Sequence, residues 1–201
     1  MKQLTESQFL SWAHQRGLGL DPQYPESADL IFRDESTDER FWCVPPEPER
    51  RPYFLSSLVE LLGDWTACFC WRHLGSWPDT ATVDPRRIND VVEHQILKGI
   101  GLPVGTADIV EFSSGESAAL VTLLFSTTVF GWSVGEDLYV VPDHARCFLQ
   151  TDHHDVVHVV FRYPDDVEMW IEQMTDRGFP LPDELPDETF KRPAWMRKHD
   201  R

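Results

Sequence analysis

Five short apolar runs follow one another between residues 107 and 161, and turn-forming residues separate them. Short runs rich in Val, Ile, Leu and Phe, bounded by Gly, Pro, Asp or Ser, are typical of β-strands. The five runs are 107–112, 118–127, 138–141, 146–150 and 156–161. Because strands that are close in sequence usually pair with one another, we expect an antiparallel meander in this half of the chain.

Helical signals mark much of the remaining chain. Thr5 and Gln8 form a capping box before an apolar face, which predicts a helix over 5–16 that ends at Gly17. Comparable start and stop signals predict helices over residues 52–62, 84–98 and 165–177, with Asp84 and Asp165 as caps. These helices pack against the sheet in the fold that we expect.

Three further strands complete the predicted fold. Residues 65–72 alternate large and small side chains, which predicts a strand with its large side chains facing the core. Residues 28–33 and 40–44 are expected to form a hairpin around the acidic loop 34–39. The expected fold class is α+β: an antiparallel β meander of about five or more strands packed with three to four helices.

The length and composition favour one domain with a tail. The chain has 201 residues, of which 41% are hydrophobic, and this is enough for one sizeable core. We expect a single domain over residues 1–178 and an extended, Pro-rich tail over 179–201 that packs on it. The end of the tail, residues 190–201, is locally basic and contains Trp195.

The net charge limits the possible partners. The chain has 34 Asp and Glu against 18 Lys and Arg, a net charge of −16. Such a charge repels nucleic acids and membrane surfaces and attracts basic proteins. The sequence contains no secretory signal and no apolar stretch of the length that a membrane span requires, so we expect a cytoplasmic protein.

The four cysteines are expected to be free thiols. Cys43, Cys68, Cys70 and Cys147 are too few for a disulfide framework and contain no C-x-x-C pair. Cys68 and Cys70 lie two residues apart in a predicted strand, which indicates packing on one face of the sheet. A catalytic pair of Cys147 with His158 is conceivable, but acidic surroundings disfavour the thiolate that it needs.

Two predicted turns between strands are rich in Asp and His. The first contains Asp143 and His144, and the second contains Asp152, His153, His154 and Asp155, with His158 in the strand that follows. Imidazole and carboxylate groups are ligands for Zn, Mn or Fe, so these residues suggest a metal-dependent hydrolase. The ligands of that alternative are Asp152, His153, His154 and His158, with support from Asp143 and His144 in the first turn.

Strand geometry argues against a metal site in these turns. His154 and His158 would stand about 13 Å apart along a strand, which is too far for two ligands of one ion. The two turns would lie at opposite ends of a strand of about 17 Å. A metal site would therefore need ligands from elsewhere, such as His73, Glu93 or His94. We expect no metal and no other cofactor.

Other catalytic motifs are missing or weak. The chain contains neither a phosphate-binding G-x-x-x-x-G-K-[ST] nor a dinucleotide-binding G-x-G-x-x-G. Residues 113–117 resemble a nucleophile elbow only superficially, and we predict a hairpin turn there.

Three functional hypotheses remain. The first is an acidic module that binds a basic protein, in the manner of immunity proteins that neutralise nuclease toxins. Its predicted contact residues are those of the two turns and a tryptophan in a predicted loop, namely Asp143, His144, Asp152, His153, His154, Asp155 and Trp77. The alternatives are the metal-dependent hydrolase and a structural or assembly subunit whose tail docks on a neighbour. The first hypothesis is favoured, and under it the protein is not an enzyme.

Overall fold

A computed structural model describes residues 1–22, 29–33, 37–73, 88–102, 109–130, 137–151 and 155–183. The strands are β1 (Lys2–Leu4), β2 (Leu18–Leu20), β3 (Leu30–Phe32), β4 (Asp38–Cys43), β5 (Ala67–His73), β6 (Ile109–Ser113), β7 (Asp137–Pro142), β8 (Cys147–Thr151) and β9 (Val156–Phe161). The helices are α1 (Glu6–Gln15), α2 (Arg51–Leu61), α3 (Ile88–Gly99), α4 (Ser117–Phe130) and α5 (Asp165–Asp176), with a 3₁₀ turn η1 (Ser114–Glu116) before α4.

Seven strands form one antiparallel sheet in the order β1-β6-β5-β7-β8-β9-β4, and β2 pairs with β3 in a small second sheet. The predicted α+β class is therefore confirmed. Strands β7, β8 and β9 form the last three strands of the predicted meander. Its first predicted strand, β6, pairs instead with β1 and β5, and β4 joins the sheet beside β9. None of the helices in the described residues has both the length and the apolar character that crossing a bilayer requires.

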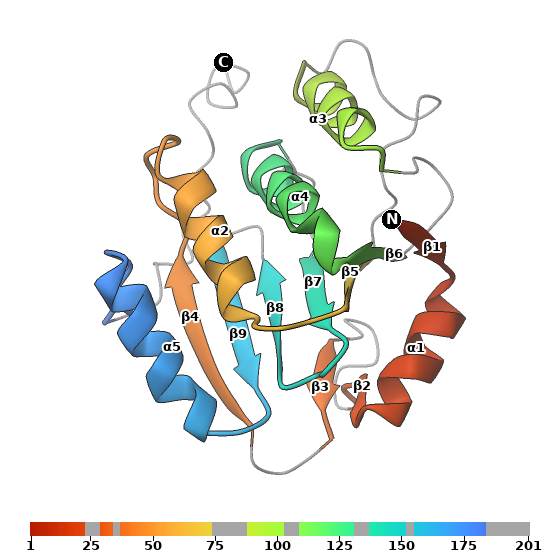
Figure 1. Cartoon of the computed structure of the whole chain (residues 1–201), viewed down its shortest axis with the longest axis vertical. Coiled ribbons are helices and arrows are strands. Elements are labelled where there is room, and N and C mark those ends of the chain that lie inside the picture. The colour runs from red at the N-terminus through yellow and green to blue at the C-terminus, as the bar shows by residue number, and fades with distance from the viewer. Residues whose placement is uncertain are drawn as a thin grey trace, which may run out of the picture.

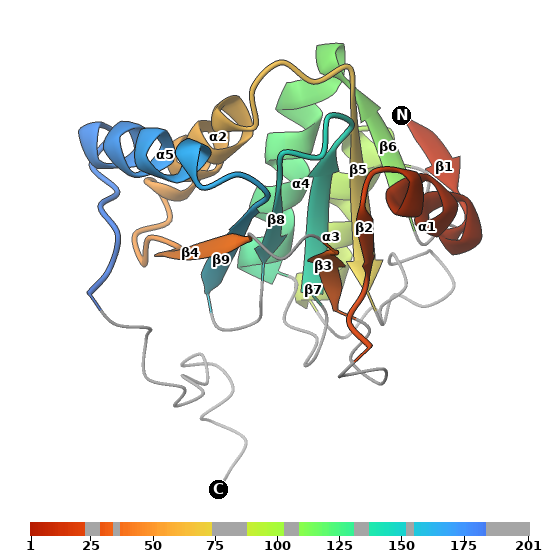
Figure 2. The same ribbon diagram turned by 90° about the horizontal axis from the view of Figure 1, so that it is seen from below.

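The molecule has three layers. Helices α2, α3, α4 and α5 cover one face of the large sheet, and α1 with the β2–β3 hairpin covers part of the other (Figures 1 and 2). Each face has its own apolar core. The core under the four helices includes Trp42, Leu58 and Trp170, and the core under α1 includes Phe9 and Trp71.

Strand β5 lies in the middle layer, and its side chains are buried on both faces of the sheet. Cys68 and Cys70 pack under the four helices, whereas Phe69 and Trp71 pack under α1, and all four side chains are buried. The large side chains Phe69 and Trp71 are buried as expected, and the opposite face is buried as well, because a central strand of this sheet is covered on both sides. The prediction that the two cysteines pack on one face is confirmed.

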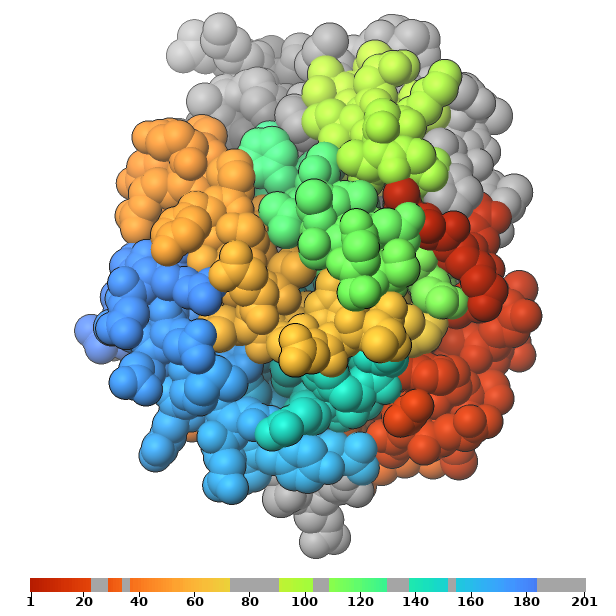
Figure 3. Space-filling view, in the orientation of Figure 1, coloured from red at the N-terminus to blue at the C-terminus, as the bar shows by residue number. Residues whose placement is uncertain are grey.

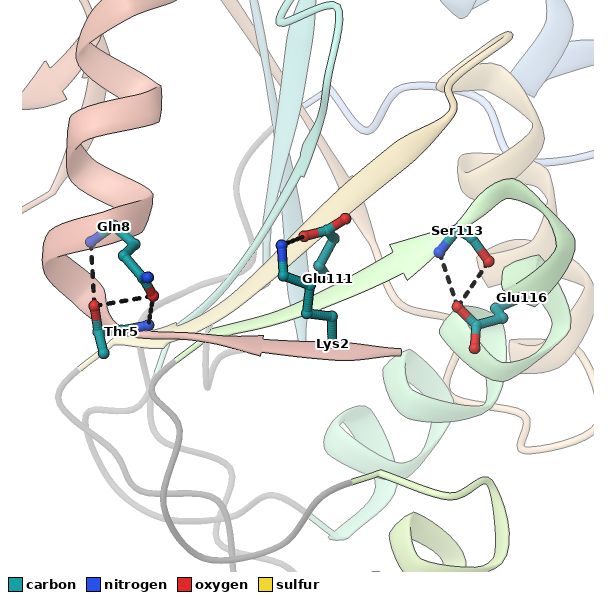
Figure 4. Close-up of polar contacts among 6 residues, drawn as sticks. All are labelled: Lys2, Thr5, Gln8, Glu111, Ser113 and Glu116. Atoms are coloured by element: carbon teal, nitrogen blue, oxygen red, sulfur yellow. Dashed lines mark hydrogen bonds and ion pairs between the residues drawn. The ribbon is translucent and has the colours of Figure 1, made fainter.

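The apolar run 118–127 forms the helix α4 and not the predicted strand. The helix begins with a second capping box, in which the amide and hydroxyl of Ser113 donate to Glu116 Oε2 at 2.9 and 2.8 Å (Figure 4). Residues 113–117 are therefore a helix start and not a hairpin turn. The run has no clear period, so periodicity does not separate a buried helix from a strand, and the helix that it forms extends over 14 residues.

The predicted hairpin over 28–44 was also wrong. β3 pairs with β2, whereas β4 pairs with β9 at the edge of the large sheet. The sequence gives no signal for β1 and β2, which have three residues each. Pairing of such short strands depends on neighbours that are distant in sequence, so a local pattern cannot predict it.

The helix boundaries agree closely with the sequence signals. Thr5 caps α1 through the predicted capping box with Gln8 (Figure 4). Gly17 follows the helix with a φ of 78°. α5 begins at Asp165, but Pro164 is its cap residue and makes no side-chain capping bond, so the predicted Asp165 cap was wrong. The predicted Asp84 cap of α3 lies outside the described residues.

The start of α4 is tied to the first residue of the chain. The Met1 ammonium pairs with Glu116 Oε1, and β1 then runs antiparallel to β6 with Lys2 Nζ 3.3 Å from Glu111 Oε2 (Figure 4). Hydrogen bonds from the Met1 ammonium, then from the Ser113 amide and hydroxyl, lower the pKa of Glu116 to about 2. The ionised carboxylate is thus part of the folded structure.

Glu116→Gln should lower the free energy of unfolding by about 1–2 kcal/mol at neutral pH, because it removes the charge but keeps a capping amide oxygen. A carboxyl group whose pKa is lowered by folding stabilises the fold above its ordinary pKa of 4.5, and this contribution is lost as the pH falls toward about 2. Urea unfolding of both proteins at neutral pH and near pH 2.5 measures the effect. A difference that is unchanged at low pH would contradict it.

Candidate functional site

Asp143, in the turn between β7 and β8, bonds to the start of β5. Its carboxylate accepts from the Thr66 amide at 3.3 Å and from the Thr66 hydroxyl, and its own amide donates to the Ala67 carbonyl at 2.8 Å. Burial is the largest influence on the pKa of Asp143 and raises it, but the hydrogen bonds from Thr66 and Ala67 together outweigh burial and lower this pKa. Asp143 therefore holds two strands together.

His144 in the same turn also bonds within the domain. Its Nδ1 accepts from the Arg146 amide at 3.1 Å, which assigns the ring proton to Nε2. Nε2 then donates to the Leu62 carbonyl, 2.8 Å away, at the end of α2. Nδ1 thus bonds within the turn, and Nε2 joins the turn to the end of α2. A role of Asp143 and His144 in partner binding stays a prediction.

The second predicted turn, between β8 and β9, lies at the opposite end of β8, as the spacing argument requires. Asp152, His153, His154 and Trp77 lie outside the described residues. Asp155 adopts a φ of 59°, and its carbonyl accepts from the Val44 amide at 2.7 Å. This backbone hydrogen bond extends the pairing of β4 with β9.

His158 lies on β9 and is half-buried. Its Nδ1 is 2.6 Å from Glu39 Oε1 on the neighbouring strand β4. Cys147 packs in the core under the four helices, on the opposite face of the sheet from His158, so these two residues do not form a catalytic pair. Burial raises the pKa of Cys147 to about 12. Within the described ranges, no three His, Cys, Asp or Glu residues are grouped as metal ligands.

A buried ion pair joins α3 to the sheet. Arg72 Nη1 on β5 lies 3.6 Å from Glu93 Oε1 on α3, and their side chains are only 7% and 5% exposed. His94, the next residue on α3, is also buried. Glu93, a possible metal ligand by sequence, therefore helps to hold α3 on the sheet through its pair with Arg72. The side chain of His73 is outside the described part of the chain.

The outward surface of α5 is the largest cluster of acidic residues on one described element. Val167, Trp170 and Met174 are buried and fix this helix to the sheet. The opposite surface carries five exposed residues at helical spacing, which we call the acidic face of α5: Asp165, Glu168, Met169, Glu172 and Asp176. α5 lies along the flank of the molecule beside α2 (Figures 1 and 3).

The charges on this face repel one another. Glu168, Glu172 and Asp176 repeat at a spacing of four residues, and such like-charged neighbours cost a helix about 0.2–0.5 kcal/mol per pair. Asp176 also lies at the helix C-terminus, where the helix dipole disfavours a negative charge. α5 contains no Lys or Arg that could offset these charges.

The nearby arginines make their contacts elsewhere. Arg146 pairs at 2.6 Å with Asp166, a partly buried residue in the first turn of α5 that is not one of the five residues of the acidic face. Arg177 pairs with Glu60 at 2.8 Å, and Arg50 donates to the Gly178 carbonyl at 3.0 Å. Among the residues that the structure describes, no cation pairs with Glu168, Glu172 or Asp176.

The central residue of the acidic face is apolar. Met169 is 38% exposed, and Asp165 and Glu172 lie one turn before and one turn after it. The sequence contained the signal for this face, because five acids and no base occur in the 12 residues of α5. The apolar spacing of this segment predicts the buried face of the helix and says nothing of the charged one.

The described residues define the protein as an acidic α+β domain with a seven-stranded antiparallel sheet. No protein-family model, no curated protein and no solved structure matches the chain. Function is therefore inferred from the surface chemistry of the domain.

Proposed function

We propose that this chain is an acidic binding module that holds a basic protein on the acidic face of α5. The observation that supports the proposal is the row of Glu168, Glu172 and Asp176, whose mutual repulsion is not offset by a cation within the described structure. A basic surface placed against this row would relieve the repulsion. The removal of this repulsion would make the free energy of binding more favourable.

Met169 adds an apolar anchor to the proposed surface. Interfaces commonly combine an apolar centre with a polar rim, and the centre contributes most of the affinity. Methionine suits such a centre because its flexible thioether adapts to different partner shapes. The partner should therefore present an apolar side chain among Lys and Arg residues.

The net charge of −16 supports fast association with a basic partner through long-range attraction. Neutralisation of a basic, nuclease-like toxin in the cytoplasm is the specific case that we propose. The turn residues Asp152, His153 and His154 are a second predicted contact, and separate variants can test it.

The variant Glu168→Gln/Glu172→Gln should bind a cationic ribonuclease about tenfold more weakly at low salt, a loss of about 1.4 kcal/mol. Isothermal titration calorimetry at two ionic strengths measures this, and wild-type affinity should fall as salt rises. Glu6→Gln/Asp64→Asn is the matched control, because it removes two exposed charges outside α5, one on α1 and one in the loop between α2 and β5.

Equal losses in both double variants would contradict the proposal, because only the net charge would then matter. An affinity lost in Asp152→Asn/His153→Ala/His154→Ala but kept in the α5 variant would place the interface at the turn. Unchanged affinity in every variant would reject an electrostatic interface altogether.

A further inference from the structure

We propose that residues 190–201 of the same chain occupy the acidic face of α5 when no partner is bound. The proposal rests on the proposed function for the role of this face, and it adds regulation: the tail competes with the basic partner. Three observations carry it, namely the position where the tail leaves the domain, its reach and its charge.

The tail begins beside the C-terminal end of α5. Gly178 turns the chain with a φ of 84°, and Phe179 is then buried against α2. The Phe179 carbonyl accepts from Trp42 Nε1 at 3.1 Å, and the Arg50 guanidinium lies 5.2 Å from the Phe179 ring. The origin of the tail is therefore held close to Asp176, the last residue of the acidic face.

The tail is long enough to cover the whole face. Lys191 is eight residue steps beyond Asp183, the last described residue, and an extended chain of eight steps spans at most about 26–29 Å. α5 has 12 residues, which correspond to about 18 Å. Residues 190–201 can thus reach every carboxylate from Asp165 to Asp176.

The composition of the segment complements the face. Residues 190–201 contain five bases and one acid, Asp200. The bases are Lys191, Arg192, Lys198, Arg197 and Arg201. Two basic pairs, 191–192 and 197–198, would lie about 20 Å apart in an extended chain, close to the length of α5. Trp195 and Met196 lie between these pairs and can cover Met169.

The contact between the tail and the acidic face should be weak and should depend on salt concentration. Exposed ion pairs contribute little each and are screened by salt. A flexible tether nevertheless supplies an effective concentration of millimolar order, which keeps a weak contact occupied. A tail bound in this way should reduce the apparent affinity of the partner about fivefold without abolishing it.

Zero-length carbodiimide cross-linking of the full chain tests the contact. Lys191 and Lys198 should cross-link to Glu168, Glu172 or Asp176 within the monomer at low salt. These cross-links should be lost in Glu168→Gln/Glu172→Gln/Asp176→Asn and in high salt. The Lys2–Glu111 pair, 3.3 Å apart in the structure, is the internal control and should cross-link in every variant.

A second measurement keeps this proposal separate from the proposed function. Lys191→Gln/Arg192→Gln/Arg197→Gln/Lys198→Gln should bind the cationic ribonuclease about fivefold more tightly than the wild type. Tail cross-links that are absent, or confined to dimers, would overturn the inference even if the α5 variant still loses binding. Tail cross-links in a protein that does not bind the ribonuclease would support the contact and reject the proposed function.

Discussion

Replacing Glu93 with alanine should lower the free energy of unfolding by about 3–5 kcal/mol, because it leaves a buried guanidinium without its carboxylate. Arg72 and Glu93 are almost fully buried, with Nη1 and Oε1 3.6 Å apart. Because both side chains are removed from solvent, the cost of losing one charge exceeds that at a surface ion pair. Urea unfolding of the full chain measures the loss.

The matched control replaces both charges. Arg72→Met/Glu93→Leu should recover most of the lost stability, because apolar side chains of similar volume tolerate burial. Gln95→Ala, an exposed position on the same helix, should change the free energy of unfolding by less than about 0.5 kcal/mol. A double variant as unstable as Glu93→Ala would contradict the explanation, since lost packing and not charge would then be responsible.

Trp170→Ala should also lower the free energy of unfolding by about 3–5 kcal/mol, because it opens a large cavity under α5. Trp170 is 1% exposed, packs edge-on against Phe161 at 5.4 Å between ring centroids, and lies 6.2 Å from the Trp42 ring. The helix that carries the acidic face is held by this packing. Thermal and urea unfolding measure the change.

Trp170→Phe is the control for this prediction and should cost less, because it keeps an aromatic ring in the site. Met169→Ala should leave the stability nearly unchanged, since Met169 points toward solvent on the acidic face. A loss as small for Trp170→Ala as for Met169→Ala would show that α5 does not depend on its buried face.

The two faces of α5 therefore have separate roles. Substitutions at Val167, Trp170 or Met174 should act on stability, whereas substitutions at Glu168 or Glu172 should act on binding. This separation is useful for experiments, because binding can be changed in a domain that stays folded. Repulsion along the acidic face predicts that its neutral variants are as stable as the wild type or slightly more stable.

Local signals in the sequence predicted the parts of the fold that depend on short-range contacts. The Thr5–Gln8 capping box placed α1, and the spacing of Val167, Trp170 and Met174 placed α5. The meander β7–β8–β9 followed from turn residues and strand alternation. In each case the signal lies in residues that are close in sequence, although the buried face of α5 packs against distant residues such as Trp42.

The candidate site was only partly predictable. The net charge indicates a basic partner, but the composition of the histidine-rich turns indicates a contact site there and not on α5. His144 shows why composition misleads at such positions: its ring nitrogens bond to the Leu62 carbonyl and the Arg146 amide, and only the folded chain brings Leu62 there. A loop histidine with these contacts is indistinguishable by sequence from one that binds a ligand.

The sequence by itself determined the α+β class, the acidic character and most helix ends, because composition, capping and periodicity act locally. Only the tertiary structure decided that residues 118–127 are helical, that β4 pairs with β9, and that β5 is buried on both faces. It also decided that Glu168, Glu172 and Asp176 face solvent together with no described cation beside them. These outcomes depend on which distant segments cover a given surface, and no local pattern of residues contains that information.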